Sequence, residues 1–260
     1  MNMYRGSTLE PPLAVVFGGH SPIAIACVRH LAEVQDVILV SRKVDSVLKE
    51  VFGSCPRVTL KEVDLEVPGQ ARSLIMQILD ERKNINGIVF LQRYRPKTEP
   101  LFEAHCAVEL WSIKDVLEAM GERNADGRRV QVLISSSPAA SKVLVDQDFH
   151  YHLVKSGQEA LVRYFSVSLA RLGICVNAIR IGSIVIKPRA ASYWDSIPDV
   201  VKSLLNIAPS GTLQSSDTVG AAFATLVRVN IAGFNGQILT IDDGFDLRDS
   251  AQVAKSCLEH

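Results

Sequence analysis

Tyr151 and Lys155 stand four residues apart in the segment Tyr-His-Leu-Val-Lys. On a helix this spacing places both side chains on one face, one turn apart. An ammonium group beside a phenol favours the phenolate form, which is otherwise rarely populated at neutral pH. A tyrosine tuned in this way can exchange a proton with an alcohol or a carbonyl. The pair therefore predicts acid–base chemistry on a small oxygen-containing substrate.

A run of three serines, at positions 135–137, precedes this pair and follows the apolar segment 130–134. A hydroxyl group there could hold the substrate oxygen near Tyr151. Counting from the apolar segment, Ser136 fits this role best and Ser135 is the reserve. A serine run after a strand can also be simple turn chemistry.

Composition sets the outer limits. The chain has 260 residues, 47% of them hydrophobic, and its 28 basic residues balance its 28 acidic residues. Neither nucleic acid nor an anionic membrane is indicated, and no apolar stretch is long enough to span a bilayer. The five scattered cysteines argue against a zinc site or a disulfide framework and fit the cytoplasm. Residues 258–260, Leu-Glu-His, look like the start of a purification tag.

Strand and helix patterns alternate along the whole chain. Short apolar runs predict strands at 13–17, 37–40, 58–63, 88–91, 130–134, 174–181 and 237–241. A long helix is predicted over 150–172, with apolar or small residues at a spacing of three or four and Gly173 as its stop. The fold class is therefore α/β: a single domain with a seven-stranded, mostly parallel, doubly wound sheet and helices on both faces.

Ligands of such a sheet bind beyond the carboxyl ends of the strands. The first strand ends in Gly18-Gly19-His20-Ser21-Pro22-Ile23-Ala24. A glycine turn there lets backbone N–H groups at a helix N-terminus face a pyrophosphate. Pro22 has no N–H group, but proline is acceptable in the first turn of a helix, and Ile23 and Ala24 still offer theirs.

The order of these features resembles that of the short-chain dehydrogenase/reductase family. That family has Thr-Gly-x-x-x-Gly-Ile-Gly, Asn-Asn-Ala-Gly, a catalytic serine, Tyr-x-x-x-Lys, and Pro-Gly after the sixth strand. The resemblance extends from about residue 13 to residue 247 and is best over 151–184. It implies a Rossmann fold, a nicotinamide cofactor and a site made of Ser136, Tyr151 and Lys155. The implied cofactor contacts are Gly18, Ser21, Ile23, Ser41, Arg42, Asp64, Leu65, Leu91, Tyr151, Lys155 and Ile184.

The end of the second strand bears on the choice of cofactor. In the family this position reads the adenosine ribose, where a carboxylate accepts hydrogen bonds from the ribose hydroxyls and an arginine pairs with a 2′-phosphate. Ser41-Arg42 stands here, without an acidic residue. NADP(H) is therefore favoured over NAD(H).

Other positions depart from the family pattern. Phe90-Leu91-Gln92-Arg93 replaces Asn-Asn-Ala-Gly, and both Phe90 and Arg93 are much larger than the family's residues. Arg93 and Arg95 could hold a phosphate or an anionic substrate, or they could be solvated loop residues. Glu109 takes the place of an asparagine that relays protons to the lysine. It could stabilise the ammonium of Lys155 and carry protons, or lie on the helix surface.

The leading hypothesis is an NADP(H)-dependent oxidoreductase that transfers hydride between nicotinamide and a carbonyl or alcohol substrate. Residues 187–215 would form the variable substrate lid, and a homodimer or homotetramer is expected. An enoyl reductase is a rival within the family, but those enzymes keep six residues between tyrosine and lysine, and that count from Lys155 reaches Asp148. The alternative of another class is a degenerate nucleotide-binding or regulatory protein with little or no turnover.

Overall fold

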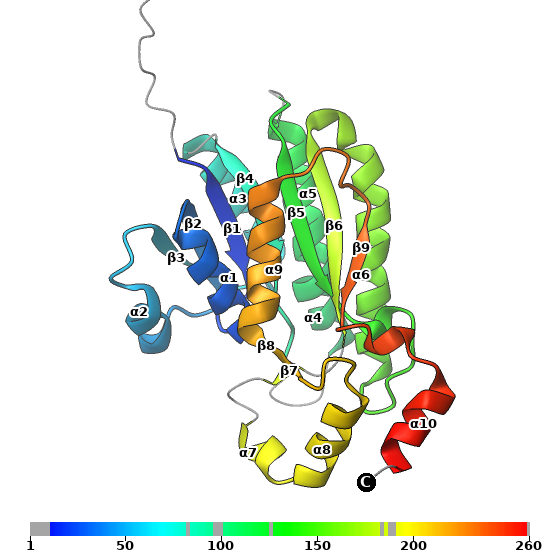
Figure 1. The fold of residues 1–260 in the computed structure, drawn as a ribbon. Coiled ribbons are helices and arrows are strands. Elements are labelled where there is room, and N and C mark those ends of the chain that lie inside the picture. Colours follow the sequence, from blue (N-terminus) through cyan, green and yellow to red (C-terminus); the bar gives the residue numbers. More distant parts are fainter. Residues whose placement is uncertain are drawn as a thin grey trace, which may run out of the picture.

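The computed structural model describes residues 11–81, 84–95, 101–124, 127–182, 185–186 and 191–258. Its centre is a seven-stranded sheet with the order β3-β2-β1-β4-β5-β6-β9, in which every neighbouring pair is parallel (Figure 1). The strands are β1 (Leu13–Phe17), β2 (Asp36–Ser41), β3 (Val58–Glu62), β4 (Ile85–Phe90), β5 (Val130–Ser136), β6 (Ile174–Ile181) and β9 (Ile238–Ile241). The predicted fold class is confirmed.

Helices cover both faces of the sheet. One face carries α1 (Pro22–Ala32), α2 (Ser46–Phe52) and α9 (Ser216–Val229), and the other carries α3 (Gln70–Glu81), α5 (Ser112–Arg123) and α6 (Phe149–Ser168). Alternate residues of β1 enter the two cores: Val15 packs in the α3/α5/α6 core, and Val16 packs in the α1/α9 core. Period-two alternation in a strand buried on both faces produces this division.

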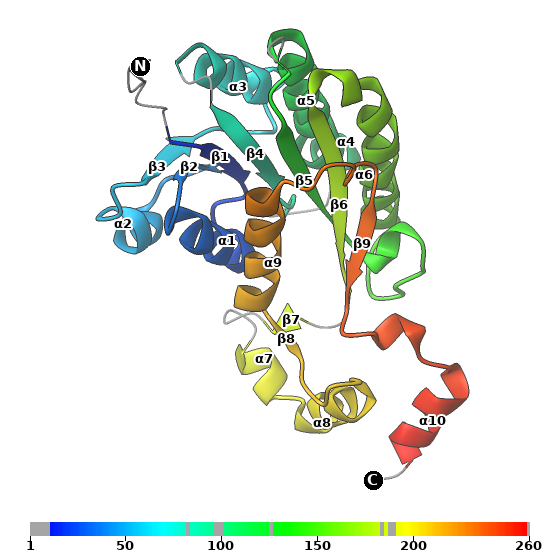
Figure 2. The same cartoon turned by 45° about the horizontal axis from the view of Figure 1, so that its top comes forward.

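The remaining elements lie mostly beyond the carboxyl edge of the sheet (Figure 2). They are α4 (Phe102–Cys106), a π-helical turn (Ala107–Trp111), β7 (Val185–Ile186), α7 (Ala191–Asp195), α8 (Pro198–Ile207), β8 (Gln214–Ser215) and α10 (Ser250–Leu258), with short 3₁₀ turns at Pro138–Ala140, Ala170–Leu172 and Phe245–Leu247. The predicted lid, 187–215, is described from residue 191 onward. No described helix combines the length and the apolar character needed to cross a membrane.

Most predicted boundaries differ from the structure by at most two residues, as for β5, which includes Ser135 and Ser136, but two differ by more. Strand β4 begins at Ile85, not at residue 88, and therefore includes Gly87. Glycine is needed there because a Cβ atom would come 2.4 Å from Val227 Cγ1 of α9. The sequence pair Asn86-Gly87 is more typical of a turn. Helix α6 ends at Ser168 and is followed by a 3₁₀ turn, so the predicted helix 150–172 is too long. Gly173, at φ 77°, ends this segment as expected.

The apolar pattern of α6 also does not mark its buried face. The face toward the sheet includes Tyr151, Lys155 and Glu159. Leu153 and Tyr164, which belong to the predicted three-to-four-residue pattern of apolar or small positions, are exposed. Phe149 and Val167 extend this exposed apolar face. This exposed apolar face could contact another subunit in the expected dimer or tetramer. The assembly itself stays a prediction.

Helices α1 and α9 pack closely because Gly220 has no side chain. A Cβ atom on Gly220 would lie 2.6 Å from Ala26 Cβ and 2.7 Å from the backbone nitrogen of Cys27. Real Cβ contacts are not this short, so the two helices would have to separate. Helix α1 carries the glycine turn at its N-terminus, and this contact therefore positions that turn.

We expect Gly220→Ala to lower the free energy of unfolding by about 1–3 kcal/mol, the usual cost of overpacking a core. The gain in helix propensity, about 0.5–1 kcal/mol, is too small to offset it. Urea denaturation measures the change. Thr225→Ala, on the exposed side of α9, is the matched control and should leave stability nearly unchanged. An equal effect in both variants would contradict the close-packing explanation.

Candidate active site

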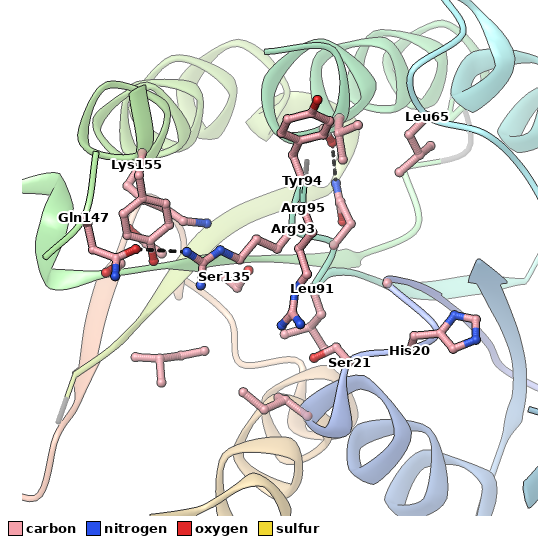
Figure 3. Close-up of a pocket in the computed structure, with 18 of the residues that line it drawn as sticks. His20, Ser21, Leu65, Leu91, Arg93, Tyr94, Arg95, Ser135, Gln147 and Lys155 are labelled. Carbon is pink, nitrogen blue, oxygen red and sulfur yellow. Dashed lines mark hydrogen bonds between the residues drawn. The ribbon is translucent and has the colours of Figure 1, made fainter. Parts of the chain in front are cut away.

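A cavity of about 760 Å³ lies at the carboxyl edge of the sheet. Its walls come from the glycine turn after β1, the ends of β2, β4 and β5, and the first turns of α6 (Figure 3). Pockets for small ligands and cofactors have this size. The predicted site residues that line it are Gly18, Ser21, Ile23, Ser41, Arg42, Asp64, Leu65, Leu91, Ser136, Tyr151 and Lys155.

One described residue of the predicted site is not on the cavity wall: Glu109 lies behind Lys155 and is fully buried. Ile184 lies outside the described residues. Phe90 does not reach the cavity either: it is buried and stacks on Phe17 with ring centroids 5.0 Å apart. Of the two large residues predicted to change the end of β4, Arg93 alone lines the cavity.

The glycine turn is held by backbone contacts. Gly18, at φ 107°, lies so close to β4 that a Cβ atom would come 2.6 Å from the nitrogen of Gln92. Helix α1 begins at Pro22, and its first bonded amide is that of Ile25, which donates to the Ser21 carbonyl at 2.9 Å. The helix itself therefore does not use the amides of Ile23 and Ala24. Despite Pro22, the turn keeps two donors at a helix N-terminus, where an anion is favoured.

A polar cluster follows β2 at the opposite end of the cavity from Tyr151. Arg42 Nη1 lies 3.1 Å from Glu66 Oε1, in an exposed ion pair. His20 bridges Ser41 Oγ at 3.0 Å and Asp45 Oδ2 at 2.9 Å. The hydrogen bond with His20 and the one from the Leu48 amide hold the pKa of Asp45 below its ordinary value.

This cluster was only partly predictable. Sequence reasoning found Ser41 and Arg42 but missed His20, Asp45 and Glu66. The Asp64-Leu65-Glu66 segment after β3 was the available signal for Glu66, because neighbouring parallel strands bring their carboxyl ends together. A 2′-phosphate that paired with Arg42 would have to compete with Glu66.

Tyr151 and Lys155 are positioned by the start of α6. Asp148 caps this helix, since its carboxylate accepts a hydrogen bond from the Tyr151 amide at 2.7 Å. The Lys155 ammonium lies 5.5 Å from the centroid of the Tyr151 ring, and it donates to Glu109 Oε2 at 2.8 Å and to Gln158 Oε1 at 3.0 Å. These two acceptors therefore hold the ammonium beside the ring.

Glu109 is the centre of this buried network. Besides Lys155, it accepts a hydrogen bond from the Tyr94 amide at 2.8 Å, and His105 Nε2 lies 3.3 Å from its Oε1 atom. Burial alone would raise the pKa of Glu109, but the charge of Lys155 and the contacts from His105, Lys155 and Tyr94 lower it to about 2. The π-helical turn Ala107–Trp111 carries this carboxylate, and such turns are frequent at functional sites. Sequence reasoning missed His105 and Gln158.

The three serines have different surroundings. Ser136 Oγ donates to Glu159 Oε1 at 2.9 Å, and Arg180 holds both oxygens of the same carboxylate at 3.0 Å or less. Ser137 accepts a hydrogen bond from the Ala139 amide. Ser135 lies on the cavity wall close to the Arg93–Gln147 pair (Figure 3). Ser136 is thus engaged with an ion pair that the sequence did not reveal, and Ser135 stays open as the serine that contacts substrate.

The neighbouring histidines have structural contacts. The His152 ring bonds to the Leu144 amide and the Asp148 carbonyl, each at 2.9 Å, and His150 packs against Phe102 with ring centroids 4.9 Å apart. On a helix, the neighbours of Tyr151 in the sequence point away from its face, which predicts solvent or packing roles for both histidines, and these contacts agree with that prediction. The cysteines at 27, 55, 106 and 175 are unpaired thiols.

Comparison with known proteins places this arrangement in a family. A family model described as enoyl-(acyl carrier protein) reductase matches residues 19–246, most of the chain. The chain belongs to the short-chain dehydrogenase/reductase family. Among curated relatives, the enoyl-[acyl-carrier-protein] reductase [NADH] FabI of Nostoc sp. is 33% identical over 95 residues, and that of Synechocystis sp. is 30% identical over 95 residues. Each match covers 36% of this chain and 36% of the relative's own length.

Solved structures of this dehydrogenase/reductase family share the fold over nearly the whole chain. ElxO with NADP bound has a TM-score of 0.79 at 17% identity, covering 92% of this chain and 100% of its own. A 3-oxoacyl-[acyl-carrier protein] reductase from Brucella melitensis in complex with NAD has a TM-score of 0.77 at 21% identity, covering 92% and 99%. At these identities the likeness concerns the fold alone.

We expect Glu109→Gln to destabilise this dehydrogenase/reductase by about 3–5 kcal/mol at neutral pH, because it leaves the buried ammonium of Lys155 without its counter-charge. The pKa of Glu109 is lower in the folded protein, at about 2, than its ordinary value of 4.5. Its stabilisation is therefore complete above pH 4.5 and is lost as the pH falls toward 2. The difference between wild type and variant should narrow across that window.

Urea denaturation from neutral pH down to about pH 3 measures this difference. Glu118→Gln is the matched control, because Glu118 pairs with Lys114 at 2.8 Å on an exposed part of α5. That variant should lose less than about 1 kcal/mol. A Glu109→Gln deficit that stayed constant with pH would contradict an ionised buried pair.

Proposed function

We propose that this protein is an NADP(H)-dependent oxidoreductase that interconverts a carbonyl compound and its alcohol. One observation carries the proposal: Tyr151 and Lys155 line the same cavity as the glycine turn after β1. A single cavity thus contains both a candidate proton donor and a helix N-terminus suited to phosphate.

The residues present fit a nicotinamide dinucleotide. The absence of side chains at Gly18 and Gly19 keeps the turn against β4 and β2, since a Cβ atom on Gly19 would come 2.7 Å from Ser41 Cβ. The amides of Ile23 and Ala24 would face the pyrophosphate, and Lys155 would hold the nicotinamide ribose. When bound, the nicotinamide supplies or accepts the hydride.

The protein's own residues supply the rest of the chemistry. Tyr151 would donate its phenolic proton to the substrate oxygen in the reductive direction and recover it from water through the cavity. Ser136 or Ser135 would orient that oxygen. Glu109 would keep Lys155 charged and in place, because the ammonium is buried and its cost of desolvation must be offset by a nearby carboxylate.

The choice of NADP(H) rests on Arg42. The similar proteins do not decide it: ElxO has NADP bound, the Brucella melitensis protein has NAD bound, and the cyanobacterial relatives are named as NADH enzymes. Arg42 lies at the end of β2 and lines the cavity. Its ion pair with Glu66 is exposed, and breaking an exposed ion pair costs little free energy.

Reduction of an enoyl thioester is the second candidate, favoured by the description of the matched family model and by the FabI relatives. The position that would carry the enoyl-reductase tyrosine is Asp148, and its carboxylate is used to cap α6. The tyrosine present, Tyr151, has the spacing of the carbonyl-reducing members. Crotonyl-coenzyme A and a carbonyl compound, offered in parallel with NADPH, would separate the two activities.

We expect Tyr151→Phe to lower kcat by about 10²–10⁴-fold, since it removes the proton donor while keeping the ring. NADPH consumption with a panel of aldehydes and ketones measures the rate. Tyr164→Phe, an exposed tyrosine on the same helix, is the matched control and should retain full activity. Wild-type turnover in Tyr151→Phe would exclude Tyr151 as the acid.

We expect Arg42→Ala to weaken NADPH binding by about tenfold or more while leaving NADH binding nearly unchanged, because the 2′-phosphate is present in NADPH alone. Titration followed by nucleotide fluorescence gives both dissociation constants. Arg57→Ala, whose guanidinium contacts the Glu33 carbonyl outside the cavity, should change neither. Equal weakening for both nucleotides would refute the phosphate role, and no binding of either would favour the non-enzymatic alternative.

A further inference from the structure

Arg93 reaches across the cavity toward Tyr151. It follows β4 by three residues, at a position where the family resemblance leads one to expect glycine. Its guanidinium carbon lies 4.5 Å from the centroid of the Tyr151 ring, a cation–π contact. Its Nη2 atom donates to Gln147 Oε1 at 3.0 Å, and this bond joins the β4 side of the cavity to the loop before α6 (Figure 3).

The partners of Arg93 differ from those of three other cations on the cavity wall. Arg42 pairs with Glu66, Lys142 with Asp246 at 2.8 Å, and Lys155 with Glu109. Among the described residues the arginines in ion pairs with carboxylates do not include Arg93, whose hydrogen-bond partner is the neutral amide of Gln147. Its charge is therefore not neutralised by the protein wall around it.

A guanidinium group has five N–H donors in a planar fork, and one of them is used by Gln147. The fork matches the two oxygens of a carboxylate, and such charge-assisted pairs are about twice as strong as neutral hydrogen bonds. An anion bound there would lie beside the Tyr151 ring. In a substrate whose carbonyl oxygen accepts the Tyr151 proton, the anionic group would then be separated from that carbonyl by only a few bonds.

We propose that Arg93 binds the carboxylate of the substrate, and that the substrate is a short-chain 2-oxo or 3-oxo acid. This inference rests on the proposed function. The carbonyl carbon would accept a hydride from NADPH, which becomes NADP⁺, and the carbonyl oxygen would accept the Tyr151 proton, giving a hydroxy acid. The apolar side chains of Leu144, Leu204 and Leu213, which also line the cavity, would contact the carbon chain.

The same chemistry could serve a second anion, the pyrophosphate of the cofactor. The location of Arg93 favours the substrate, because its guanidinium stacks on the ring of the proton donor. The pyrophosphate is expected at the amides of Ile23 and Ala24, on the N-terminus of α1. The experiment therefore measures substrate and cofactor binding separately.

The test compares 2-oxobutanoate with its uncharged methyl ester, and 3-oxobutanoate with its ethyl ester, as substrates for NADPH-dependent reduction. In Arg93→Gln we expect kcat/KM for the acids to fall by about tenfold or more, and for the esters by less than about twofold. Arg93→Lys, which keeps the charge but not the fork, should be intermediate. Lys142→Gln, which removes another cavity cation, is the matched control and should not alter the preference for acids.

A binding measurement gives a readout without turnover. Oxamate, an unreactive carboxylate shaped like a 2-oxo acid, should bind to the wild-type protein in the presence of NADP⁺ and should bind about tenfold or more weakly to Arg93→Gln by calorimetry. The dissociation constant of NADPH should be the same in both proteins. Weaker NADPH binding in the variant would assign Arg93 to the cofactor and overturn the proposal.

The remaining outcomes are also distinct. A wild-type protein that reduces the esters as well as the acids would overturn the role of Arg93 and leave the carbonyl-reductase function standing. An equal loss for acids and esters in Arg93→Gln would show that Arg93 only supports Tyr151. A wild-type protein that binds NADPH but reduces none of these compounds, and does not bind oxamate, would contradict the oxo-acid assignment. A protein that binds no nucleotide would remove the proposed function itself.

Discussion

The buried ion pair between Lys155 and Glu109 is the constraint on which the candidate site depends. Both side chains are nearly or fully inaccessible to water, and the ammonium lies 2.8 Å from the carboxylate. Neither charge could be buried alone, because an unpaired ion in the interior costs several kcal/mol. Pairing fixes the position of α6 against the π-helical turn, and with it the position of Tyr151 one helical turn from Lys155. Tyr151, the proposed acid, is thus positioned by a charge pair made by the neighbouring lysine.

A second, partly buried ion pair involves the next turn of the same helix. Glu159, one turn beyond Lys155 on α6, joins Ser136 at the end of β5 to Arg180 on β6. Ser136 and Arg180 are direct neighbours in the sheet register. The face that α6 presents to the sheet is therefore polar over its first half and apolar further on, where Val162 and Phe165 enter the core. A helix that must hold charges at one end and pack at the other cannot show a single clean apolar stripe.

The cavity wall shows how charge is arranged around the site. Arg42, Lys142 and Lys155 have carboxylate partners of their own, and their charges are largely compensated. Arg93 rests on an aromatic ring and a neutral amide. Arg93 is exposed to the solvent of the cavity, so an anion can reach its guanidinium without first displacing a carboxylate partner. The same β4 terminus that departs from the family pattern in sequence is therefore the place where specificity for a charged substrate would arise.

The sequence by itself determined the fold and the placement of Tyr151 and Lys155 on one helix face. Buried parallel strands are short continuous apolar runs, and the fixed pitch of a helix places Tyr151 beside Lys155 whatever the rest of the chain does. The glycine turn and Arg42 could also be predicted to lie at one site, because the carboxyl ends of parallel strands meet at one edge of the sheet.

What only the tertiary structure decided are the partners that come from distant segments. From the sequence, Glu109 could lie either on the helix surface or beside Lys155. In the structure the π-helical turn places it against that lysine, 46 residues away in the chain. His20, Glu66 and Glu159 were not predicted, since ion pairs across elements leave no periodic trace in sequence. Arg93 was open for a related reason: a flexible side chain after a strand has no fixed direction until the cavity around it is formed, and here an aromatic ring and an amide on α6 and its preceding loop give it one.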